Sequence, residues 1–66
     1  MVKMTLKAAR INANLSQKDA AKLLNISNKT LSSWENGHNV PKVDMVQKLC
    51  ELYRIDYDAI NFLTNG

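Results

Sequence analysis

The chain has 66 residues, enough for one small domain with a single hydrophobic core. Its net charge is +3, and 45% of its residues are hydrophobic, a proportion that argues against disorder. One cysteine excludes an internal disulfide and suits a reducing compartment, and no apolar run reaches the ~20 residues of a membrane span. We therefore expect a cytoplasmic domain without a membrane partner.

Taken in chain order, the first expected element is a helix over residues 5–13, whose inner stripe includes Leu6 and Ala9. Arg10 falls near this stripe, which is an unusual position for a charged side chain. The sequence leaves two alternatives for Arg10. It either has a fixed partner, or it is exposed without one.

Residues 16–37 are expected to form two short helices separated by a tight turn. Ser16 is a good N-cap, and Asp19 three residues later completes a pattern like the capping box. Asn25 ends the first of these helices, because Asn tolerates the left-handed backbone that such a turn requires. The helix has a small and apolar face, made of Ala20, Ala21, Leu23 and Leu24.

The second helix of this pair is expected over residues 28–36, with Ser27 as its N-cap. Leu31 and Trp34, spaced i and i+3, form its buried side, and Gly37 ends it. Its remaining side chains are short or flexible hydrogen-bonding groups, namely Asn28, Lys29, Ser32 and Ser33.

A longer helix is expected over residues 43–54. One of its faces is apolar and contains Val43, Val46, Leu49, Cys50 and Tyr53. Met45 and Leu52 lie off this face, so the helix is either buried in the middle of the domain or carries a protein-interaction patch. Asp56 can cap a last short helix over residues 57–63.

The sequence contains no constellation of catalytic residues. His38 is the lone histidine and lies in an expected loop, and Cys50 lies on the inner face of a helix, where an inert buried thiol is expected. One histidine and one cysteine do not make a zinc site, and two glycines do not make a phosphate-binding loop. We expect no enzyme activity, no cofactor and no metal, and no small-molecule site is evident.

Residues 16–37 resemble the helix-turn-helix of lambda-repressor/Cro-type DNA-binding domains. The residues that carry the resemblance are Gln17, Ala21, Ile26, Leu31 and the segment Trp34-Glu35-Asn36-Gly37. One departure is Asn25, where the family usually has glycine. The likeness spans roughly residues 4–63. It implies an all-α, compact five-helix domain over residues 1–66, whose second and third helices form the helix-turn-helix.

The resemblance implies sequence-specific binding to double-stranded DNA by a repressor-type transcriptional regulator, with residues 28–36 in the major groove. The charge distribution favours the same partner. Residues 1–34 carry six basic side chains and one acidic one, whereas residues 35–66 carry three basic and five acidic ones. Charge alone does not distinguish a DNA-binding surface from one that is simply solvated.

The family positions suggest which residues contact DNA. Paired donors and acceptors or a directed cation recognise base edges, so base contacts are expected from Ser27, Asn28, Lys29, Ser32 and Ser33. Asn28 suits adenine and Lys29 suits guanine. Phosphate contacts are expected from Gln17, Asn36, His38 and Lys42. By the same resemblance, Arg10 pairs with Glu35 and ties the first helix to the end of the third.

A module of this size recognises few base pairs, so a homodimer on a palindromic operator is expected, at least on DNA. In domains of the family that this sequence resembles, the turn between the last two helices often makes the dimer contact. The candidate dimer contacts are therefore Ile55, Asp56, Tyr57 and Asp58, next to the apolar Met45 and Leu52. The alternative function is an antitoxin or a protein-interaction adaptor with the same fold. The sequence leaves open the operator, the regulated genes, activation versus repression, and whether the chain is a whole protein or one domain of a longer one.

Overall fold

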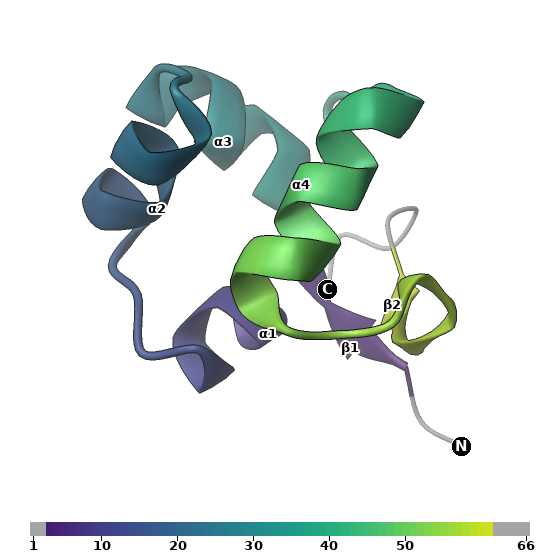
Figure 1. Ribbon diagram of the computed structural model, residues 1–66. Helices are drawn as coiled ribbons and strands as arrows, with labels where there is room; N and C mark the ends of the chain where they lie inside the picture. The colour runs from purple at the N-terminus through teal and green to yellow at the C-terminus, as the bar shows by residue number, and fades with distance from the viewer. Residues whose placement is uncertain (1–2, 62–66) are drawn as a thin grey trace.

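The computed structural model describes residues 3–61. Most of this part is helical (Figure 1). The elements in chain order are β1 (Met4–Thr5), α1 (Leu6–Asn12), α2 (Gln17–Leu24), α3 (Asn28–Glu35), α4 (Val43–Tyr53), the 3-10 turn η1 (Tyr57–Ala59) and β2 (Ile60–Asn61). None of the described helices is both long and apolar enough to cross a membrane.

Three of the helices begin with a side-chain cap. The hydroxyl oxygens of Thr5, Ser16 and Ser27 each accept a hydrogen bond from the backbone N–H three residues further on, at 3.0–3.1 Å. A cap of this kind satisfies one of the free N–H groups of the first helical turn and stabilises the helix by about 1 kcal/mol. The caps expected at Ser16 and Ser27 are confirmed.

Each α-helix of the described part is followed, one or two residues after its last residue, by a residue with left-handed backbone. These residues are Asn14 (φ 62°), Asn25 (φ 59°), Gly37 (φ 78°) and Arg54 (φ 53°). After α3, the N–H of Gly37 donates to the carbonyl of Trp34 at 3.2 Å, and the N–H of His38 donates to that of Ser33 at 3.0 Å. This pair of bonds is the Schellman motif, which satisfies carbonyls that the helix leaves free. The left-handed turn expected at Asn25 is confirmed.

The core lies where α1 packs against α3 and α4. Leu31 and Leu49 are fully buried at its centre, and Trp34 is partly buried against it. Two sequence expectations about buried faces are wrong, because Leu23 is 62% exposed and Val43 is 78% exposed. Both residues lie at a helix end: Leu23 in the last turn of α2 and Val43 at the first position of α4.

The expected fifth helix is also wrong within the described residues. Only Tyr57–Ala59 turn, as a single 3-10 turn, and Ile60–Asn61 then pair in parallel with Met4–Thr5 as β2 and β1. This pairing supplies backbone hydrogen bonds that a helix would have made internally, and it buries Ile60 to 3% exposure. The expected end of the helix at residue 63 lies outside the described residues. The helix-turn-helix architecture stands, with four α-helices in residues 3–61.

Candidate nucleic-acid interface

The helix pair α2 and α3 lies at one end of the molecule, away from β1 and β2 (Figure 1). The helices are joined by a tight turn, in which Ile26 packs against the core. Of the side chains expected to contact bases, Ser27, Asn28 and Lys29 are exposed, whereas Ser32 and Ser33 are half-buried. All five therefore lie on or beside the solvent face of α3.

Arg10 has a fixed partner. Its Nε lies 2.7 Å from Glu35 Oε2, and its Nη1 donates to the carbonyl oxygen of Leu15 at 2.8 Å. The two charged side chains are only 9% and 3% exposed. The ion pair that the resemblance implies is thus present in the structure. It joins α1 to the last residue of α3, so the direction of α3 is fixed by a contact inside the domain.

A chain of hydrogen bonds leads from this ion pair to the solvent face of α3. Gln17 Nε2 donates to Glu35 Oε1 at 3.1 Å, and Asn28 Nδ2 donates to Gln17 Oε1 at 2.9 Å. An ionised carboxylate only accepts hydrogen bonds, so Gln17 must turn its N–H₂ group toward Glu35 and its oxygen toward Asn28. Asn28 must then donate, and it keeps its oxygen and one N–H for another ligand.

Two asparagines beyond α3 bind the serines of its second turn. Asn36 Nδ2 donates to Ser32 Oγ at 3.3 Å, and Asn39 Nδ2 donates to Ser33 Oγ at 2.7 Å. Sequence reasoning missed Asn39 as a neighbour of the site. Gly37 was the available signal, because the Schellman turn brings the following loop back over the end of α3.

The remaining candidate DNA contacts lie in α2, at the start of α3 and in the segment between α3 and α4. Ser27 Oγ shares a hydrogen bond of 2.8 Å with Thr30 Oγ1 in addition to capping the helix. Asn36, His38 and Lys42 are exposed between α3 and α4. Gln17 is half-buried, and its amide binds both Glu35 and Asn28. One N–H of the amide is left for another ligand.

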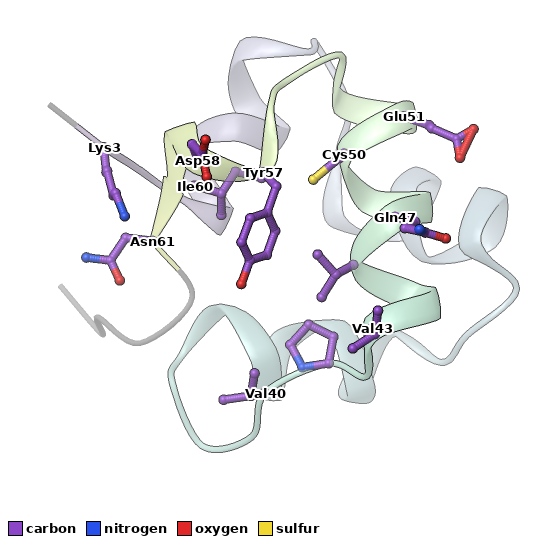
Figure 2. A pocket seen from close by; sticks show the side chains of 12 residues that line it. Lys3, Val40, Val43, Gln47, Cys50, Glu51, Tyr57, Asp58, Ile60 and Asn61 are labelled. Atoms are coloured by element: carbon purple, nitrogen blue, oxygen red, sulfur yellow. The ribbon is translucent and has the colours of Figure 1, made fainter. Parts of the chain in front are cut away.

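The candidate dimer residues do not form one surface. Tyr57 and Asp58 line an open groove of about 960 Å³ together with Val40, Pro41 and Val43. Figure 2 shows the Tyr57 side chain extending between the loop at Val40 and the helix that carries Cys50. By contrast, Leu52 and Ile55 line a separate hollow near Met4. Met45 packs against the core, and Asp56 is exposed at the start of η1.

Cys50 lies in the wall of the same groove (Figure 2). Burial, and to a lesser extent the charge of Asp56, raises the pKa of its thiol above the ordinary value. The thiol is therefore protonated at neutral pH and is a weak nucleophile. Within residues 3–61, no group of three or more His, Cys, Asp or Glu side chains is placed to hold a metal ion.

The helix-turn-helix family matches residues 6–60, which include every α-helix described above. The chain belongs to the helix-turn-helix family. The chain is also 43% identical over 55 residues to the HTH-type transcriptional regulator ImmR of Bacillus subtilis (strain 168). This match covers 83% of the chain but 43% of ImmR, so this helix-turn-helix domain spans less than half the length of that relative. No solved structure matches the chain significantly.

Proposed function

We propose that this helix-turn-helix domain binds double-stranded DNA sequence-specifically as part of a repressor-type transcriptional regulator in the cytoplasm. Its family and its likeness to a protein named as a transcriptional regulator support DNA-binding transcription regulation. In this proposal α3 enters the major groove and contacts bases through Ser27, Asn28, Lys29, Ser32 and Ser33. Gln17, Asn36, His38 and Lys42 contact phosphates and hold the helix in register.

The observation that carries the proposal is the hydrogen-bond chain from Glu35 through Gln17 to Asn28. The chain of hydrogen bonds starts at the buried Glu35 carboxylate and fixes the orientation of the exposed Asn28 side chain. A side chain held in this way loses less conformational freedom on binding, so it discriminates bases better than a freely rotating one. Asn28 keeps one donor and one acceptor, the pair that matches adenine N7 and N6.

We further propose that the domain acts as a dimer on a palindromic site. Val40, Val43 and Tyr57 are 56%, 78% and 63% exposed around one groove, and such an apolar surface is expected to be covered in the functional state. A second copy is the proposed occupant, with Tyr57 and Asp58 in the contact. Sedimentation that shows only monomers, both free and on palindromic DNA, would remove this part of the proposal.

The first experiment is enrichment of duplexes from a random pool, followed by fluorescence anisotropy at several salt concentrations. We expect one symmetric site that binds well above random DNA, with an affinity that falls as salt rises. Asn28→Ala and Lys29→Ala each lower the discrimination between bases by about 1–3 kcal/mol. Asn12→Ala and Lys48→Ala are the matched controls, because they remove the same side chains from exposed positions on α1 and α4.

The groove favours one alternative, a protein-interaction module such as an antitoxin or an adaptor. That function depends on the groove, and substitution of Asn28 or Lys29 would not affect it. If circular dichroism shows an intact fold but every duplex binds alike or not at all, base recognition is wrong. Val43→Asp, which places a charge in the exposed groove, would then be the variant to test against protein partners.

A further inference from the structure

At the second turn of α3, two asparagine side chains bind the hydroxyl groups of two serines. Ser32 and Ser33 accept from the amide nitrogens of Asn36 and Asn39, at 3.3 and 2.7 Å. The backbone turn after α3 holds the second pair in place, because the N–H of His38 donates to the carbonyl of Ser33. Both contacts lie at the exposed surface, where a DNA duplex could reach them.

A serine hydroxyl has one hydrogen and two lone pairs. When an amide N–H occupies one lone pair, the hydroxyl keeps one further lone pair and its hydrogen, which can point toward another acceptor. Lys29 lies one turn before Ser33 on the same face of α3, and its ammonium group has three donors and no acceptor. Lys29, Ser32 and Ser33 thus offer donors side by side; we call these three residues the donor surface.

We propose that the donor surface recognises a run of hydrogen-bond acceptors in the major groove, and that Asn36 and Asn39 are the positioning residues that set its polarity. The matching atoms are guanine N7 and O6, adenine N7 and thymine O4. Asn28 is the neighbouring exception, because its oxygen remains free to accept from adenine N6. This inference rests on the proposed DNA binding, and it specifies which base atoms the protein contacts.

The test uses the enriched duplex with single base atoms altered. Acceptors are deleted or weakened with 7-deazapurines, 6-thioguanine and 4-thiothymine, since sulfur is a weak acceptor. Donors are deleted by placing purine for adenine and pyrimidin-2-one for cytosine. For the native chain, we expect acceptor deletion at one position to weaken binding about 2- to 10-fold. In Ser33→Ala the same deletion has no further effect.

Asn39→Asp tests the polarity itself. A carboxylate at this position only accepts hydrogen bonds, so the hydroxyl of Ser33 must turn toward it and present a lone pair to DNA. We expect the acceptor deletion to lose its effect in this variant, and a donor deletion to become the one that weakens binding. Asn12→Asp is the control for the added negative charge, because it changes an exposed residue of α1 in the same way.

The outcomes separate this inference from the proposed function. If no duplex is enriched above random DNA, base recognition fails and the donor surface fails with it. A second outcome is that a site is enriched and its binding depends on Asn28, but Ser33→Ala abolishes the effect of a donor deletion or of no deletion at all. In that case the proposed function stands and the donor surface is wrong. Coupling to an acceptor deletion that reverses in Asn39→Asp supports the inference.

Discussion

Replacement of Arg10 by Met should cost this domain a large part of its stability. Arg10→Met leaves the Glu35 carboxylate, which is 3% exposed, with Gln17 as its remaining hydrogen-bond donor among the described side chains. Removing one partner of a buried ion pair costs about 3–5 kcal/mol. A chain of this length has a total unfolding free energy of roughly 3–10 kcal/mol. We therefore expect Arg10→Met to be partly or largely unfolded at room temperature.

The double variant Arg10→Met, Glu35→Leu tests the reason for that loss. It removes both charges, and replacement of a buried pair by apolar side chains of similar size is often nearly neutral. We expect it to cost less than about 2 kcal/mol, so the two changes are strongly coupled. Urea unfolding can be followed by circular dichroism and by the fluorescence of Trp34, which is partly buried against the core. A single-variant cost below about 1 kcal/mol, or simple additivity, would refute the buried-charge argument.

Three further predictions concern the backbone and the core. Arg54→Gly should raise the unfolding free energy by about 0.5–1 kcal/mol, because left-handed backbone (φ 53°) disfavours a residue with a Cβ; an unchanged urea midpoint would contradict this. Gly37→Ala, at φ 78°, should lower it by about 1–2 kcal/mol in the same assay, with Ala8→Gly as a control for the exchange at an ordinary helical position. The Tyr53 hydroxyl is buried without a hydrogen-bond partner among residues 3–61, so Tyr53→Phe should be neutral or slightly stabilising at pH 7. Burial, and then the charge of Glu35, raises the pKa of Tyr53 to about 12 against the lowering effect of Arg10, so the native chain should lose stability between pH 10 and 12 and Tyr53→Phe should lose less.

The local parts of the fold could be predicted from the sequence. Ser16, Ser27, Asn25 and Gly37 act through bonds to backbone groups only a few residues away, so their roles follow from residue type and spacing. The β1–β2 pair could not be found in this way, because it joins the start of the described chain to its end. The acidic residues near Tyr57 indicate a helix start, and nothing local signals that Ile60 pairs with Met4 instead.

The candidate site could be predicted from the sequence to a similar extent. The exposed positions of α3 follow from helical periodicity, and the partner of Arg10 followed from the family resemblance rather than from its own position in the sequence. The link from Gln17 to Asn28 and the contact of Asn39 with Ser33 depend on how separate elements meet in space. Such contacts become visible only when the tertiary structure is known.

The short β1–β2 ladder also has a consequence for the order of folding. The contacts between α2 and α3 are local, whereas the ladder closes a loop of nearly the whole described chain around Met4 and Ile60. Loop closure costs entropy before any non-local contact compensates for it, so the ladder should form late and open early. Its amide hydrogens should then exchange with solvent sooner than those of α2 and α3. The helix pair α2 and α3 would remain intact while the β1–β2 ladder opens and closes.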